Sequence, residues 1–333
     1  MAQRNIINYY PTGPLSHCGS VRSSRIPASC RPSGTALACG LLRAPTMRTP
    51  SRPAVTAWTA KRLAVLPLPM APRRPVFIIG CARSGTSVLK RVLGRHPEID
   101  GYPSEANELW HPSSYPWATG AKRASPLWRD PQGFTRDSLT HWPAHHGARI
   151  RRVFALHQRL SGRPVFLNKS SMLNFMLPDV DRLFPDARFI HIVRDGRAVA
   201  LSYALKEHPK MLQGEAIYRA SGLWISFEDL CERMEGLWVE TLTEIETQKR
   251  ALGWDASGRY HECRYEDFCT TPLESAREII AYLGLDPATA QLGEHVKSMN
   301  YKFREQLPAP LLAAITSTMA AMLTVKGYAT GAP

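Results

Sequence analysis

The chain has 333 residues, of which 44% are apolar, and carries a formal net charge of +14. This length and apolar content allow one large or two ordinary globular domains with a substantial core. Residues 1–74 hold eleven Lys and Arg and no Asp or Glu, so the rest of the chain carries only +3 (14 − 11). Because the excess charge is confined to this leading stretch, composition argues against a polyanion-binding domain, and we expect no nucleic-acid partner. Nucleic-acid binding through the leading stretch itself is the alternative.

Residues 1–74 are rich in Ser, Arg, Pro and Ala and show no helical or strand periodicity. This composition predicts a disordered basic extension, and residues 75–333 are predicted to form a single catalytic domain. The extension resembles an organelle transit peptide, although a translation start at Met47 or Met70 accounts for it more simply. No apolar run reaches the about 18 residues of a membrane span, so we expect a cytoplasmic protein without a transmembrane segment, with organelle import left open.

Metal and redox sites are not expected. None of the seven cysteines forms a pair with two-residue spacing, and no cluster of His, Cys and carboxylates has the spacing of metal ligands. We therefore predict free thiols and no metal.

The order of predicted elements is strand, loop, helix, and this unit recurs. Apolar runs predict four strands, and helical spacing of apolar residues predicts helices between and after them. The predicted strands cover 75–80, 165–168, 189–193 and 260–264. Two predicted helices include 88–93 and 199–203, and the others cover 216–249, 272–283 and 310–323. Strands that alternate with helices indicate an α/β fold, a P-loop-like, mainly parallel sheet flanked by helices. Sites in such folds lie at the carboxyl ends of the strands.

Two loops at that edge are typical of phosphate sites. In "GCARSGTS", Gly80 and Gly85 bracket a strand-to-helix turn whose N–H groups suit an anion, but Thr86 stands where a nucleoside-triphosphatase has its lysine. In the second loop, Arg194 ends a strand and Ser202 lies about two helical turns further on, so both side chains can face one point. Together the loops predict a ligand with two separate phosphate groups.

These motifs resemble those of sulfotransferases that use 3′-phosphoadenosine 5′-phosphosulfate (PAPS), and most closely those of tyrosylprotein sulfotransferases and their bacterial relatives. That family has a "GxPRSGT" loop and an "RDxR…S" element; here they read "GCARSGTS" and "RDGRAVALS". Ala82 replaces the usual proline, and Ser87 replaces a frequent threonine. The likeness extends from Val76 to about Tyr328. Further matches in the same order are "HPEI" at 96–99, "NK" at 168–169, "RLFP" at 182–185 and "RYEDF" at 264–268.

The resemblance implies roles for particular residues. Glu105 is the implied base for the acceptor, Arg83 would lie beside the sulfonate, and Lys169 would donate to the bridging oxygen. The implied donor-binding residues are Arg83, Ser84, Gly85, Thr86, Ser87, Arg194, Ser202 and Lys302. Glu108 remains an alternative base, as do the histidines that cytosolic small-molecule enzymes would suggest, His141, His145, His146 and His157. Their surroundings, "THWPAHHG" at 140–147, are predicted to form a loop.

Other functions remain open at this stage. A nucleotide kinase with a degenerate loop is disfavoured because Thr86 occupies the lysine position and no aspartate suited to magnesium follows an apolar strand. A catalytically silent nucleotide-binding module would keep both loops but would not need Glu105 or Lys169. The acceptor is expected to carry a hydroxyl group, with a tyrosine, glycan, lipid or small alcohol all possible. A homodimer is also possible.

Overall fold

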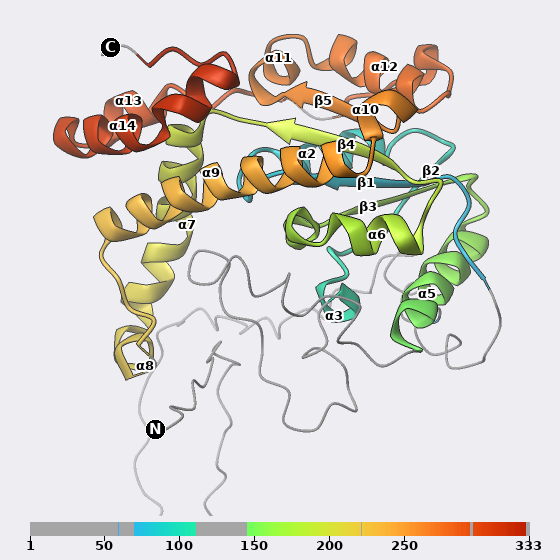
Figure 1. Cartoon of the computed structure of the whole chain (residues 1–333), viewed down its shortest axis with the longest axis horizontal. Coiled ribbons are helices and arrows are strands. Elements are labelled where there is room, and N and C mark those ends of the chain that lie inside the picture. Colours follow the sequence, from blue (N-terminus) through green and yellow to red (C-terminus); the bar gives the residue numbers. More distant parts are fainter. Residues whose placement is uncertain (1–58, 60–69, 111–144, 221, 294–295, 331–333) are drawn as a thin grey trace, which may run out of the picture.

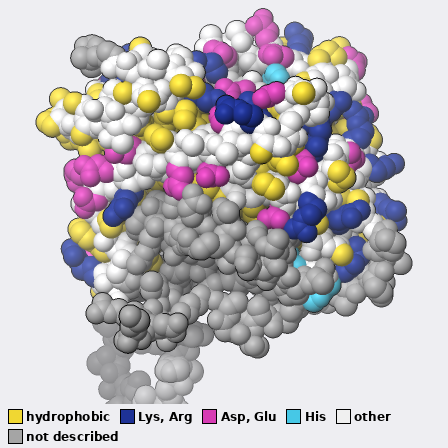
Figure 2. Space-filling view, in the orientation of Figure 1, with side chains coloured by type: hydrophobic (Ala, Val, Ile, Leu, Met, Phe, Trp, Pro, Cys, Tyr) yellow, Lys and Arg dark blue, Asp and Glu magenta, His cyan; other side chains and the backbone are white. Residues whose placement is uncertain are grey.

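The computed structural model describes residues 59, 70–110, 145–220, 222–293 and 296–330. Almost all of the predicted basic extension lies outside the described residues, as does His141. On the face shown in Figure 2, basic and acidic side chains are interspersed. Within the described parts of the chain, no helix is both long and apolar enough to cross a membrane.

Five parallel strands form one sheet, in the order β2-β3-β1-β4-β5 (Figure 1). The strands are β1 (Pro75–Ile79), β2 (Ile99–Gly101), β3 (Val165–Lys169), β4 (Arg188–Val193) and β5 (Tyr260–Arg264). The predicted parallel sheet is therefore confirmed, with β1 at its centre. Because all five strands run the same way, the loops that follow them meet at one edge of the sheet.

Helices cover both faces of the sheet because side chains alternate along each strand. Val76 and Ile78 of β1 pack with α2 and α12 on one face, whereas Phe77 and Ile79 pack with α5 and α6 on the other. Figure 1 shows α12 and α6 on opposite sides. The helices are α2 (Thr86–Leu93), α3 (Asn107–Trp110), α5 (His146–Ser161), α6 (Leu177–Leu183), α7 (Gly196–Gln213), α8 (Glu215–Ala220), α9 (Phe227–Ala251), α10 (Trp254–Ser257), α11 (Tyr265–Thr270), α12 (Pro272–Tyr282), α13 (Lys302–Gln306) and α14 (Ala309–Val325), with the 3-10 turns η3 (Ser171–Phe175) and η4 (Pro287–Thr289).

A second apolar cluster joins the C-terminal helices to the sheet domain. Leu201 of α7, Trp238 of α9, Phe303 of α13 and Met319 of α14 belong to it, and all four are buried. The indole nitrogen of Trp238 donates a hydrogen bond of 3.0 Å to the carbonyl oxygen of Arg194. The C-terminal helices are thus packed next to the end of β4, where the second predicted phosphate loop begins.

Two expectations about helices were wrong. The stretch predicted as one helix over 216–249 is two helices, α8 and α9, which are separated between Ala220 and Phe227. Of the segment expected to be a loop, 140–147, residues 140–144 lie outside the described residues, and the last two begin the 16-residue helix α5, which was not predicted. Its buried face includes His146 and His157, so these histidines are core residues of a helix.

Candidate active site

The loop of residues 80–87 joins β1 to α2 and has a constrained backbone. Gly80 and Gly85 have φ angles of +135° and +95°, and Arg83 has a φ of +74°, which is uncommon for a residue with a side chain. A Cβ atom on Gly85 would lie 2.5 Å from the ring of Tyr265, so both the conformation and the space require glycine. Strain of this kind is typical of ligand-binding loops.

The loop presents hydrogen-bond donors that suit an anion. Ser84 is 1% exposed, and its Oγ has no hydrogen-bond partner among the described residues. In the first turn of α2, the N–H groups of Val88 and Leu89 donate to the carbonyl oxygen of Gly85 at 3.0 Å, whereas those of Thr86 and Ser87 have no acceptor among the described residues. These N–H groups and the helix dipole attract negative charge. The donor set therefore fits a terminal phosphate or sulfate group.

Asn174 holds the start of this loop. The backbone N–H of Gly80 donates to Asn174 Oδ1 at 2.9 Å, and Asn174 Nδ2 donates to the carbonyl oxygen of Gly80 at 3.0 Å. The paired bonds fix the direction in which the chain leaves β1. Sequence reasoning did not single out Asn174, because nothing local to η3 indicates that its amide reaches a residue 94 positions away.

A small cavity on the β4 side of the loop brings together the residues predicted for the second phosphate. The cavity has a volume of about 280 Å³. Arg83 Nε donates to Ser202 Oγ at 3.2 Å, and Arg194 Nη1 donates to the carbonyl oxygen of Arg83 at 2.9 Å. The lining residues are Arg83, Arg194, Ala198, Leu201, Ser202, Leu205, Lys206, Met299 and Lys302. The lining thus includes four predicted donor-binding residues, Arg83 of the loop, Arg194 after β4, Ser202 of α7 and Lys302 of α13, and the space is positively charged.

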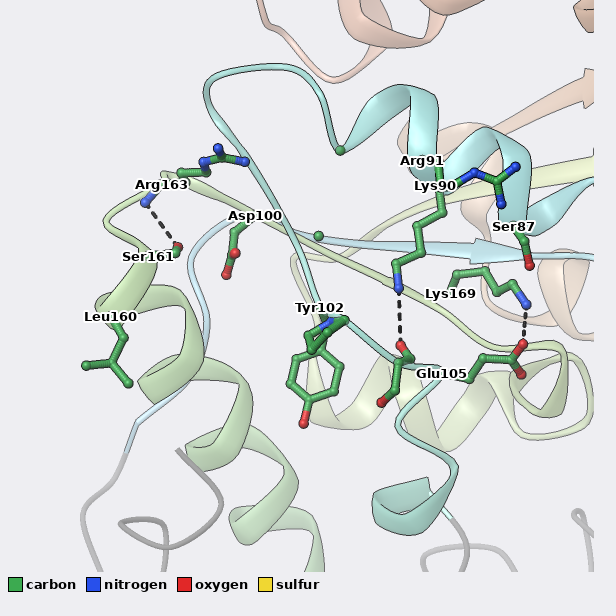
Figure 3. A pocket seen from close by; sticks show the side chains of 14 residues that line it. Ser87, Lys90, Arg91, Asp100, Tyr102, Glu105, Leu160, Ser161, Arg163 and Lys169 are labelled. Atoms are coloured by element: carbon green, nitrogen blue, oxygen red, sulfur yellow. Dashed lines mark hydrogen bonds and ion pairs between the residues drawn. The ribbon is translucent and has the colours of Figure 1, made fainter. Parts of the chain in front are cut away.

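A larger cavity lies on the β3 side of the same loop and contains the predicted catalytic pair. Its volume is about 1230 Å³, and Ser87, Glu105 and Lys169 line it. Lys169, at the end of β3, forms an ion pair with Glu105, which follows β2 (Figure 3). The Lys169 side chain is 6% exposed and that of Glu105 is 41% exposed. A carboxylate and an ammonium group therefore meet in the lining of the large cavity.

Lys90 is a further cation in this cavity that the sequence did not indicate. It lies on α2, and its Nζ donates to the carbonyl oxygen of Ser104 at 3.3 Å (Figure 3). Burial, together with the charge of Lys169, lowers the pKa of Lys90 to about 8. Lys90 thus braces the loop that carries Glu105.

The alternative bases are placed differently. His146 Nε2 lies 2.8 Å from the carbonyl oxygen of Leu109, and burial lowers the pKa of His146 to about 4. His157 is fully buried and contacts Asp100 at 3.3 Å. Neither histidine lines either cavity, nor does His145. The side chain of Glu108 lies outside the described residues, so its relation to the large cavity is not defined.

No group of three or more His, Cys, Asp and Glu residues in the described ranges could hold a metal ion. The buried thiols are also far from reactive. Burial raises the pKa of Cys81, Cys231 and Cys263 to about 12.

Comparison with known proteins identifies the family. The sulfotransferase family profile matches residues 75–289, which is most of the described domain. The chain belongs to the sulfotransferase family. The match covers all five strands, the loop of residues 80–87 and the Arg194 and Ser202 positions.

Relatives of this sulfotransferase are named for different acceptors. It is 25% identical over 220 residues to a putative protein-tyrosine sulfotransferase of Caenorhabditis briggsae, covering 66% of this chain and 69% of the relative. It is 30% identical over 139 residues to carbohydrate sulfotransferase 3 of Mus musculus, covering 40% and 28%. It is 27% identical over 125 residues to the omega-hydroxy-beta-dihydromenaquinone-9 sulfotransferase Stf3 of Mycobacterium bovis, covering 37% and 29%. The matches thus span less than a third of the mouse and mycobacterial proteins.

Solved structures share the fold of this sulfotransferase. Sulfotransferase STF9 from Mycobacterium avium has a TM-score of 0.53 at 14% identity, with 83% of this chain and 82% of that one covered. The sulfotransferase domain from the curacin biosynthetic pathway has a TM-score of 0.50 at 16% identity, with 78% and 99% covered. At these identities the comparison establishes a common fold.

Proposed function

We propose that this sulfotransferase transfers a sulfuryl group from PAPS to an acceptor hydroxyl, with Glu105 as the base. One observation carries the proposal. The strained loop of residues 80–87 lies between two cavities, of which one is lined by Arg194 and Ser202 and the other by the Lys169–Glu105 pair. This arrangement separates an anion-binding space from a space that holds a base.

The residues present fit a donor with two phosphate-type groups. Ser84 Oγ and the N–H groups at the start of α2 would bind the 5′-phosphosulfate, together with the Arg83 guanidinium and the Thr86 and Ser87 hydroxyls. Arg194, Ser202 and Lys302 would bind the 3′-phosphate in the small cavity. When bound, the donor supplies the sulfuryl group, and adenosine 3′,5′-bisphosphate is released after the transfer.

Glu105 and Lys169 would have separate roles, one in proton transfer and the other in stabilising the leaving group. Glu105 would accept the proton of the acceptor hydroxyl as the oxygen forms its bond to sulfur. Lys169 would donate a hydrogen bond to the phosphate oxygen that leaves sulfur, where negative charge develops. Because Glu105 and Lys169 form an ion pair, the acceptor hydroxyl and the sulfuryl group would separate them during the transfer.

The acceptor would bind in the large cavity, because Glu105 lines that space. Relatives are named for tyrosine, carbohydrate and hydroxylated menaquinone acceptors. A panel of a tyrosine peptide, a sulfatable oligosaccharide and a hydroxylated quinone, each incubated with radiolabelled PAPS, would identify the acceptor class.

The first test is calorimetric titration of the full chain with adenosine 3′,5′-bisphosphate and, separately, with ATP and magnesium. We expect bisphosphate binding, weak or absent ATP binding, and loss of bisphosphate binding in the Arg194→Ala, Ser202→Ala variant. Arg219→Ala, which removes an exposed arginine of α8, is the matched control and should bind normally. Binding of ATP with magnesium but not of the bisphosphate would support a kinase or a silent nucleotide-binding module instead.

A further inference from the structure

A single carboxylate, Glu266 of α11, receives three hydrogen bonds close to the small cavity. Its Oε1 accepts from the backbone N–H of Asp195 at 3.1 Å and from Asn300 Nδ2, and its Oε2 accepts from the Tyr328 hydroxyl at 2.9 Å. Asp195 follows Arg194 directly and is the N-cap residue of α7. Glu266 therefore connects the second phosphate loop to two separate places in the C-terminal part of the chain.

Asn300 links Glu266 to the guanidinium of Arg194. Arg194 Nε donates to Asn300 Oδ1 at 2.8 Å, while Asn300 Nδ2 donates to Glu266. An arginine can only donate and a carboxylate only accept, so these partners fix which side of the amide faces each of them. The result is a chain from carboxylate through amide to guanidinium, in which each bond polarises the next.

The remaining contacts of Arg194 leave part of its guanidinium for a ligand. Its plane lies over the ring of Tyr265, with 4.3 Å between the guanidinium carbon and the ring centroid, and Nη1 bonds to the carbonyl oxygen of Arg83. Among the described residues, Nη2 has no hydrogen-bond partner. Burial lowers the pKa of Arg194, and the negative charge of Glu266 opposes this shift. Glu266 thus supplies a nearby negative charge that stabilises the buried Arg194 cation.

The same amide also places the opposite wall of the cavity. Met299 and Lys302, which line the small cavity, flank Asn300 in the sequence. Docking of Asn300 onto Glu266 and Arg194 brings these two side chains to the cavity. Tyr328 contributes a third anchor, because burial and the Glu266 charge raise the pKa of its hydroxyl well above the ordinary range and keep it a donor.

We propose that Glu266 is a positioning residue for the 3′-phosphate site, acting through Asn300 to hold both Arg194 and the 299–302 segment around the small cavity. This inference rests on the proposed function, since it takes the small cavity as the donor's 3′-phosphate site. A carboxylate in direct contact with a phosphate would repel it. Glu266 instead favours phosphate binding indirectly, because the Asn300 amide lies between the carboxylate and Arg194. Binding at Arg194 and docking of the C-terminal segment are then coupled, and each strengthens the other.

Calorimetry of Glu266→Gln tests the coupling to the ligand. A glutamine offers one oxygen to three donors, so the Asn300 link weakens while the shape is retained. We expect bisphosphate affinity to fall by about tenfold to a hundredfold, the range for loss of hydrogen bonds to charged groups. Affinity for adenosine 5′-monophosphate, which lacks the 3′-phosphate, should change less than twofold. Equal losses for both nucleotides would indicate a general structural defect and would overturn the proposal.

Two further variants sharpen this test. Asp267→Asn removes the same charge from the neighbouring position of α11, where the side chain is 70% exposed, and should leave both affinities unchanged. In a double-mutant cycle, Glu266→Gln should weaken bisphosphate binding far less when Arg194 is already alanine. Additive losses in that cycle would show that Glu266 acts independently of Arg194.

Hydrogen exchange of the ligand-free chain provides a readout that does not depend on the donor assignment. Glu266→Gln and Asn300→Ala should each speed amide exchange in residues 296–307, whereas Asp267→Asn should not. If wild-type protein fails to bind the bisphosphate while this exchange pattern holds, the donor assignment is wrong but Glu266 still anchors the segment. Unchanged exchange in both variants would remove the proposed anchoring.

Discussion

Glu105→Gln is the most direct test of the chemistry at the scale of single residues. The glutamine keeps the shape of the side chain but cannot take the acceptor proton, so kcat should fall by about 10²–10⁴-fold. Bisphosphate affinity should stay within about twofold, because Glu105 lines the large cavity and the donor's 3′-phosphate is assigned to the small one. The measurement is single-turnover transfer from radiolabelled PAPS to the acceptor found in the panel, with calorimetry alongside.

Glu108→Gln is the matched control, since it makes the same change three positions away on α3. It should retain near wild-type kcat. A larger loss in Glu108→Gln than in Glu105→Gln would instead assign the base to Glu108.

Sequence reasoning indicated residues whose neighbours lie nearby in the chain, and missed those held by distant contacts. Gly85, Arg194 and Ser202 stand in short motifs whose backbone geometry is local, and they could be named in advance. Asn300 and Glu266 could not, because their roles arise where β4, α11 and the C-terminal segment meet. Family resemblance, rather than spacing, pointed to Glu105 and Lys169, which lie 64 positions apart.

At the scale of elements, helix ends were harder to predict than helix existence. The break between α8 and α9 carries two local signals, Gly222 with a φ of +66° and the N-cap Ser226, whose Oγ accepts from the Asp229 N–H at 3.0 Å. Helix α5 escaped prediction because its buried face includes Arg149, His157 and Gln158, which do not read as an apolar stripe. A strand of three residues, as in β2, is too short to show alternation.

Two glycines in helices allow a paired prediction about element stability. Gly236 lies within α9 with nothing described within 4 Å of an added Cβ, so Gly236→Ala should raise the free energy of unfolding by about 0.5–1 kcal/mol. Gly196 begins α7, and a Cβ there would lie 2.6 Å from Trp238 and 2.7 Å from Met319. Gly196→Ala should therefore lower the free energy of unfolding by about 1–3 kcal/mol. Urea unfolding of both variants measures the difference, and a stabilising Gly196→Ala would contradict the close packing of α7.

At the scale of the whole molecule, the alternation of strands and helices was sufficient to predict the parallel sheet. The strand order was not predictable, because it depends on which apolar faces pack together after the chain folds. The attachment of the C-terminal helix α14 to α9 and β5 was not predictable either. Lys326, at the end of α14, bonds through Nζ to Glu246 of α9 at 2.9 Å and to Glu262 of β5 at 2.8 Å. This one ammonium ties three elements that are distant in sequence.

These contacts predict how stability depends on pH. Burial of the Glu262 carboxyl favours its neutral form, but hydrogen bonds from His191 and Lys326 outweigh this and lower its pKa. A lowered folded-state pKa stabilises the fold above the unfolded value of about 4.5, and this stability is lost as the pH falls. Burial also lowers the pKa of His191. Below about pH 6.5 this histidine therefore takes up a proton more readily in the unfolded state, which also lowers stability as the pH falls. Melting temperature should therefore decline from pH 6.5 downward.

Lys326→Met isolates the ammonium in this network. At pH 7 the variant leaves Glu262 without its lysine partner and Glu246 with Lys249 alone. The free energy of unfolding should fall by about 2 kcal/mol, between the values typical of exposed and buried pairs. At pH 4 the carboxylates begin to take up protons, so the deficit relative to wild type should shrink. Lys210→Met, in an exposed pair with Glu207, should cost less than about 0.5 kcal/mol at either pH. An equal deficit for Lys326→Met at pH 7 and pH 4 would mean that packing of the lysine stem, rather than its charge, holds α14 to the sheet.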